Sequence, residues 1–155
     1  MDKVVEQEIC KRLAEVFQRA LPEVSVGGNW LPSGSSAIKG AEPWRGAKLD
    51  ISVDPRSYDK YTSLTCEVQV ELDGEFPVAS DPKLDRSVAA YAAVVAVLEE
   101  WHGSISAVKR DLAVEGCFDP VGLQAAGGVF ELDRDTKVRH YSQTFALRGR
   151  VARTT

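Results

Sequence analysis

Few residues of this chain have the types and spacing that catalysis or metal binding would need. The three cysteines, Cys10, Cys66 and Cys117, lie far apart, and neither of the two histidines, His102 and His140, belongs to a motif that pairs it with a cysteine. A cysteine nucleophile needs a base, and zinc ligands commonly occur in closely spaced pairs. We therefore expect no catalytic residue, no metal site and free thiols in a reducing compartment.

Two pairs of aspartates have a spacing that acid–base catalysis would allow, namely Asp81 with Asp85 and Asp133 with Asp135. The first pair brackets a predicted helix start and the second lies in a predicted turn, and both are common places for aspartate. The glycine-rich run that ends at Lys48 lacks the G-x-x-x-x-G-K-[ST] spacing of a phosphate-binding loop. The sequence thus indicates no cofactor, and an enzyme is the less favoured interpretation.

Length and composition indicate one globular domain over residues 1–155. Of these residues 44% are hydrophobic and 27% are charged, which is enough for a real core. The longest apolar run, Val88–Leu98, is far shorter than the roughly 20 residues that cross a bilayer, so we expect no membrane partner.

Charge is unevenly distributed along the sequence. The net charge is −4, but residues 134–155 contain six basic residues and one acid, a net charge of +5, so residues 1–133 carry −9. This acidic remainder would repel phosphate, which disfavours nucleic-acid binding as the main task. The basic end is either an ordinary solvated terminus or a surface that meets the acidic part of an identical subunit.

The hydrophobic periodicity predicts two helices. Apolar residues at three- and four-residue steps predict an amphipathic helix over residues 3–21, which Pro22 ends. The second helix is predicted from about Leu84 to His102, with Asp81 or Ser80 placed to cap it. It is apolar nearly all round, so the sheet, the first helix or another subunit must cover most of its sides.

Alternating apolar and polar residues predict the strands. They cover residues 49–53, 62–72, 112–118, 129–132 and 137–151, with an irregular loop at 119–128. The order of helix, two strands, helix and two or three more strands favours an α+β two-layer sandwich. We expect a mainly antiparallel sheet of four to five strands with the two helices on one face.

A long irregular loop is predicted at about residues 27–46, with five glycines and two prolines. Its tryptophans and isoleucine would not be needed in a solvated linker. Either the tryptophans fold back onto the domain, or they anchor the loop in a neighbouring molecule, because tryptophan is common at interface hot spots. Together with the basic C-terminal segment, the candidate interface residues are Trp30, Ile38, Trp44, Arg148, Arg150 and Arg153.

The order and spacing of several features carry a family resemblance outside residues 27–46. They are the helix closing with Leu21-Pro22-Glu23-Val24, the strand at 49–53, the alternating strand ending at Leu72, the Ala/Val-rich helix Val88–Leu98 and the closing strand at 140–151. In these features the chain resembles the tail terminator or tail completion proteins at the head–tail junction of long-tailed bacteriophages and related phage-like particles.

The resemblance implies a non-enzymatic structural protein of the virion, assembled in the host cytoplasm. Such a protein forms a ring, usually of six identical subunits, that caps the tail tube and stops its growth. Its partners are its own copies, the tail tube protein and a head-side connector or neck protein. Another neck or connector component of the same particle is the first alternative, and a small ligand-binding domain or enzyme is the second.

One face of the long predicted strand is polar, through Glu67, Gln69 and Glu71. In a ring this face would point to solvent or line a central channel. An acidic lining would let DNA pass without specific binding, because neutralised phosphates are the source of non-specific affinity. An ordinary solvated sheet face explains the same pattern.

Overall fold

The computed structural model describes residues 4–32, 44–58, 64–79, 81–125, 129–133 and 137–151. Within these ranges the helices are α1 (Val5–Ala20), α2 (Asp85–Gly103) and α3 (Ile105–Leu112). The strands are β1 (Ser25–Gly28), β2 (Lys48–Val53), β3 (Ser57–Tyr58), β4 (Thr65–Pro77), β5 (Phe118–Ala125), β6 (Val129–Asp133) and β7 (Val138–Val151).

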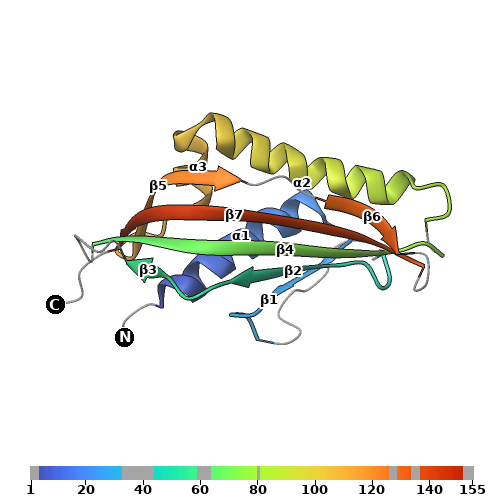
Figure 1. Ribbon diagram of the computed structural model, residues 1–155, viewed down its shortest axis with the longest axis horizontal. Helices are drawn as coiled ribbons and strands as arrows, with labels where there is room; N and C mark the ends of the chain where they lie inside the picture. The colour runs from blue at the N-terminus through green and yellow to red at the C-terminus, as the bar shows by residue number, and fades with distance from the viewer. Residues whose placement is uncertain are drawn as a thin grey trace.

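All of these strands belong to one sheet, whose main path runs β1-β2-β4-β7-β5, with β3 also beside β4 and β6 also beside β7. The pairing is antiparallel except between β1 and β2, which run parallel. The long central pair is β4 and β7, in continuous register from Thr65 opposite Arg150 to Pro77 opposite Val138 (Figure 1). This pair sets the long axis of the molecule.

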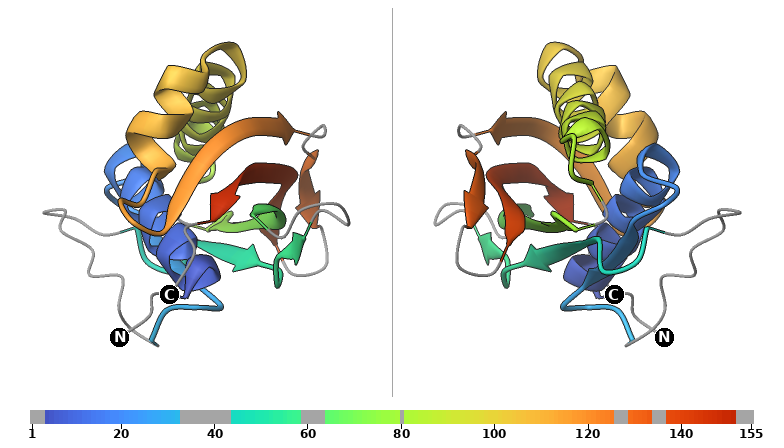
Figure 2. Two further views of the ribbon diagram at one scale, coloured as in Figure 1. Left: turned by 90° about the vertical axis from the view of Figure 1, so that its left-hand side faces the viewer. Right: turned by 90° about the vertical axis from the view of Figure 1, so that its right-hand side faces the viewer.

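The helices lie on one face of the sheet and leave the other face open (Figure 2). Side chains along β4 and β7 alternate between buried and more accessible positions, as a sheet covered on one side requires. Among the buried ones, Leu72, Phe145 and Leu147 are at most 2% exposed. They join the buried stripes of the helices in one hydrophobic core.

Each long helix buries a single stripe. In α1 the stripe includes Ile9, Leu13 and Phe17, at the spacing that the sequence predicts. In α2 it includes Val94 and Trp101, although the helix is apolar on its other sides too. None of the helices in the described residues has the length and hydropathy that a membrane span requires.

The predicted α+β class, with helices over a mainly antiparallel sheet, is confirmed. The predicted counts were too low, since the described residues form three helices and seven strands. The strand predicted at 112–118 is wrong. Leu112 instead ends α3, which begins after Ser104, whose Oγ accepts a hydrogen bond from the amide of Ala107 at 3.2 Å. Residues 113–117 turn the chain, with an isolated bridge between Val114 and Phe118, and Phe118 begins β5.

The predicted loop at 119–128 is also wrong in its first part, where β5 extends along β7. The register of β5 against β7 shifts between Pro120 and Gly122. The interrupted alternation of apolar and polar residues at this point therefore reflects a bulge within a strand and not a loop. Of the long loop predicted at 27–46, Gly27 and Gly28 belong to β1, and residues 33–43 lie outside the described residues.

Candidate interaction surfaces

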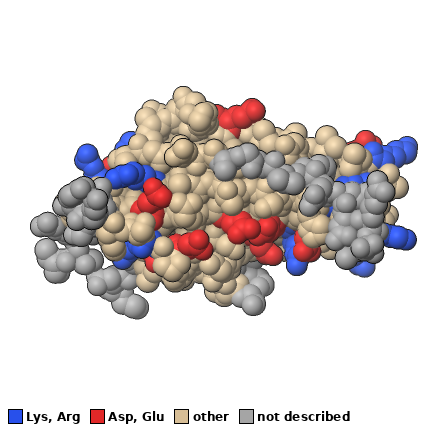
Figure 3. Space-filling model, viewed as in Figure 1, with Lys and Arg blue, Asp and Glu red and all other residues tan. Residues whose placement is uncertain are grey.

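The open face of the sheet is acidic along its middle. Four carboxylates of β4 lie on the side of the strand that alternates with the buried residues, and Asp50 of β2 lies directly opposite Asp73 in the ladder. The β4 carboxylates belong to Glu67, Glu71, Asp73 and Glu75. Figure 3, which views this face, shows acidic side chains gathered across its middle.

The carboxylates of this face repel one another, which changes the pKa of Glu71. The negative charge of Asp73 raises the pKa of the Glu71 carboxyl above its ordinary value, and Asp54 adds to the effect. Lys48 pairs with Glu75 at 3.4 Å near one end of β4, and Arg148 lies opposite Glu67 near the other. Negative charge is therefore least compensated in the middle of the strand.

The three residues predicted for a channel or solvent face do lie on this open face. Gln69 and Glu71 are exposed, and Glu67 is half-buried. The Glu67 carboxylate accepts a hydrogen bond from the Gln69 side-chain amide at 2.8 Å. Whether the face lines a channel stays a prediction, because a solvated face would have the same composition.

Both tryptophans of the predicted loop pack against their own chain. Trp44 is 2% exposed, and its ring stacks on Phe76 with the centroids 5.3 Å apart and the planes 15° apart. The guanidinium of Arg86 covers the Trp44 ring at 4.8 Å. Trp30 is half-buried, and its indole nitrogen donates a hydrogen bond to the carbonyl of Val53 at 2.7 Å. These contacts support the first of the two alternatives, in which the tryptophans fold back onto the domain.

The remaining interface candidates divide into two groups. Arg148 and Arg150 are exposed near the end of β7, opposite Glu67 and Thr65 of β4. Ile38 and Arg153 lie outside the described residues. A role for any of these residues in an interface stays a prediction.

Buried polar groups hold the start of α2 to β7. The carboxylate of Asp81 accepts hydrogen bonds from the amides of Arg86 and Ser87 at 3.0 and 2.8 Å and from the Ser87 hydroxyl at 2.6 Å. Arg139 of β7, 7% exposed, donates to the Asp81 carbonyl at 2.8 Å and lies 3.2 Å from its carboxylate. Burial alone would raise the pKa of Asp81, but these hydrogen bonds and the Arg139 charge outweigh it and lower the pKa. The Asp81 carboxylate therefore caps the first turn of α2, as predicted, from three residues before Leu84, which occupies the N-cap position itself.

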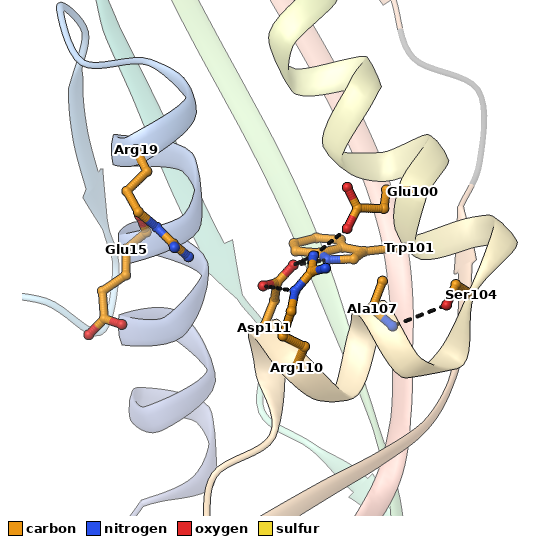
Figure 4. A network of polar contacts seen from close by, with 8 residues as sticks. All are labelled: Glu15, Arg19, Glu100, Trp101, Ser104, Ala107, Arg110 and Asp111. Atoms are coloured by element: carbon orange, nitrogen blue, oxygen red, sulfur yellow. Dashed lines mark hydrogen bonds and ion pairs between the residues drawn. The ribbon is translucent and has the colours of Figure 1, made fainter.

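A second polar network fixes α3 against α2 (Figure 4). The indole nitrogen of Trp101 donates to the Asp111 carboxylate at 2.7 Å, and Arg110 bonds both Asp111 and Glu100. The hydrogen bond from Arg110 is the main reason that the pKa of Asp111 is lowered, against the opposing effect of burial. All four residues have partners within the network, which gives it a structural role.

The outer side of α2 is a largely apolar surface that is exposed among the residues that the structure describes. We call Asp85, Val88, Ala89, Ala92, Ala96 and Glu99 the outer stripe of α2. All six are exposed, and they lie opposite the buried stripe of the helix. The sequence predicts that most sides of α2 need cover, which stays a prediction, and the structure identifies the side that the described sheet and helices leave open.

A groove of about 470 Å³ lies where α1 meets the turn between α3 and β5. We call it the α3–β5 groove. Its apolar lining includes Val114, Phe118 and Val151, and its basic lining consists of Arg12 and Arg150. Sequence reasoning missed this groove because its residues come from three separate segments that only the fold brings together.

Metal ligands are not clustered in the part of the chain that the structure describes, where no three His, Cys, Asp or Glu side chains are placed to hold an ion. The three cysteines are buried and form no disulfide with one another. Burial raises the pKa of the Cys10 and Cys66 thiols, which disfavours the reactive thiolate.

Comparison with known proteins gives a likeness in structure but none in sequence. No protein-family model matches this chain, and no curated protein matches it. A chain of the virion of a native gene transfer agent particle matches it with a TM-score of 0.50 and 18% sequence identity. The match covers 94% of this chain and 91% of that chain, so the fold of this protein is shared with a chain of that gene transfer agent virion over nearly the whole length of both.

Proposed function

We propose that this protein is a structural component of a phage-like virion, where it forms a ring that caps the tail tube and joins it to the head-side connector. The observation that carries the proposal is the fold likeness to a gene transfer agent virion chain over 94% of this sequence. The order of elements that resembles tail terminator proteins agrees with it, since the predicted long strand and Ala/Val-rich helix correspond to β4 and α2.

The surfaces of the chain support an assembling role. The outer stripe of α2 exposes Val88 and three alanines on a helix that carries no charge between Arg86 and Glu99. Exposed apolar surface of this kind commonly marks an interaction site. The strongly bonded polar groups, including Asp81 and Arg139, serve to hold elements together, which fits a protein without catalytic chemistry.

The acidic open face supports a position beside passing DNA. Glu71 and Asp73 repel each other, and they would repel phosphate in the same way. A ring whose inner wall is this face would let DNA through without binding it, since no counterions would be released from the phosphates.

The experiment is to purify the full chain and determine its mass by light scattering and its shape by negative-stain electron microscopy. It is then mixed separately with the tail tube protein and the head-side connector protein of its own particle. Closed rings that bind the ends of tubes support the proposal. Binding to the connector alone would indicate a different neck component, and a monomer that binds neither protein at high concentration would overturn the proposal.

A further inference from the structure

The end of the molecule where β4 leads into α2 and β7 begins carries exposed cations. Lys83 precedes α2 and Lys137 precedes β7, and both are exposed. Hydrogen bonds link the two segments, because the amide of Val78 donates to the carbonyl of Lys137 at 3.0 Å. The chain then turns through Asp81, whose amide donates to Val78 and whose carbonyl accepts from the amide of Leu84 at 3.1 Å. We call Lys83, Leu84 and Lys137 the basic tip, which lies at the right-hand end of Figure 1, where Figure 3 shows basic side chains.

The charges of the basic tip are available to a partner. Among the residues that the structure describes, neither Lys83 nor Lys137 forms an ion pair. Arg45 adds an exposed cation to the same end of the molecule, since the tryptophan before it packs under Arg86. Asp85 is an exposed carboxylate beside the basic tip and offsets one of these charges. The end of the molecule therefore keeps a net positive charge.

Two of the three residues of the basic tip have an unfavourable backbone conformation. Leu84 has a φ of 70° and Lys137 a φ of 55°, and they are the two non-glycine residues with positive φ in the part of the chain that the structure describes. Such residues persist where their surroundings fix them, and they are common at functional sites. Leu84 is 38% exposed and lies outside the hydrophobic core. Because this leucine adds little to the packing of its own chain, a role in contact with another molecule explains it better.

The backbone at the start of α2 is already bonded within the chain. The Asp81 carboxylate accepts hydrogen bonds from the amides of Arg86 and Ser87, and Arg139 balances its charge. These contacts cap the helix and hold the segment before it in place. A partner at this end must therefore be bound by the exposed side chains of the basic tip, which the buried contacts keep rigid.

We propose that the basic tip docks on an acidic surface of the neighbouring protein in the particle, with Leu84 in an apolar recess and Lys83 and Lys137 facing carboxylates. The contact rests on the proposed function and names a surface that the ring uses to bind its neighbour. The basic tip lies at one end of the long axis set by β4 and β7, so it is free when the open face of the sheet lines a channel. DNA would match the cations but would offer no recess for a leucine, and a second basic tip would repel the first.

Charge reversal tests the polar part of the contact. The full chain carrying both Lys83→Glu and Lys137→Glu is compared with the wild type in binding to the tail tube protein and to the head-side connector protein of its own particle, by biolayer interferometry. We expect the dissociation constant for one of these proteins to rise by roughly tenfold or more, and wild-type binding to that protein to weaken at high salt. Lys11→Glu with Arg12→Glu, the same change of charge at exposed positions of α1, is the matched control and should bind as the wild type does.

Leu84→Asn separates docking from folding. Asparagine tolerates the left-handed conformation better than leucine, so this variant should melt no lower than the wild type. It should nevertheless bind the same neighbour roughly tenfold more weakly, because the apolar side chain at the centre of the contact is lost. A purely structural role for Leu84 cannot produce a variant that is as stable as the wild type but binds less tightly.

The outcomes distinguish this contact from the proposed function. If the wild type binds tube or connector protein and all the basic-tip variants bind as tightly, the contact is wrong although the proposed function stands. If the basic tip instead binds double-stranded DNA, seen as DNA binding that the two lysine changes abolish while protein binding is unchanged, the contact is also wrong. If the wild type binds neither protein, the contact and the proposed function both fail.

Discussion

Replacement of Trp44 by alanine separates a structural role for this residue from a role in assembly. Trp44 is 2% exposed, stacks on Phe76 and lies under the guanidinium of Arg86. Truncating a buried tryptophan to alanine costs about 3–5 kcal/mol of unfolding free energy. For a chain of this length that loss corresponds to a fall in melting temperature of about 6–20 °C.

The assay is thermal unfolding by circular dichroism, with the oligomeric state of the same samples measured below the transition. Trp44→Phe is the matched control, because a phenylalanine ring can still stack on Phe76, and it should lower the melting temperature clearly less. A Trp44→Ala variant that melts within about 3 °C of the wild type but no longer assembles would refute the reasoning. The side chain would then belong to an interface between molecules.

Three further predictions concern backbone strain, a buried ion pair and a close packing contact. Leu84 has a φ of 70°, a conformation that favours asparagine over leucine, so Leu84→Asn should stabilise the chain by about 1 kcal/mol in urea unfolding. The lowered pKa of Asp81 means that its contribution to stability is present above the unfolded pKa of about 4 and is lost as the pH falls through the lower folded value. Melting temperatures measured between pH 7 and pH 2 should therefore fall less steeply for Asp81→Asn, which should also be less stable at pH 7 by about 3–5 kcal/mol because the buried Arg139 loses the carboxylate that balances its charge. Gly149→Ala should lower the melting temperature, because the added Cβ would lie 2.7 Å from the carbonyl oxygen of Asp119, whereas Gly122→Ala meets nothing within 4 Å and should not.

Each of these predictions has an outcome that contradicts it. Equal stability of the Leu84→Asn and Leu84→Val variants would show that the positive φ is not strained, since a β-branched residue tolerates it least. An Asp81→Asn variant with the same pH profile as the wild type would assign the acid sensitivity to other carboxylates. Equal melting temperatures for the two glycine variants would mean that the Phe118 ring and the backbone of Asp119 move aside at no cost.

Elements with a sustained period could be predicted from the sequence. The stripe of Ile9, Leu13 and Phe17 predicts α1, and the alternation that ends at Leu72 predicts most of β4. Both signals are local, because each repeats several times within one element. The open face of β4, with Glu67 and Glu71 on one side, follows from the same alternation.

Short elements and surfaces made from distant segments could not be predicted. The eight residues of α3 give too few turns for a clear period, and Val114 and Phe118 beyond them alternate as a strand would. The four residues of β1 are held by pairing with β2, which no local pattern encodes. The α3–β5 groove joins Arg12 to Arg150 across most of the chain, so only the fold can create it.

The continuous pairing of β4 with β7 has a mechanical consequence. All 13 residues of β4 are in register with β7, with hydrogen bonds perpendicular to the strands. A pull along the strand direction would load many of these bonds at the same time, whereas a pull across it would break them one after another. The subunit should therefore resist tension along its long axis far better than tension across it.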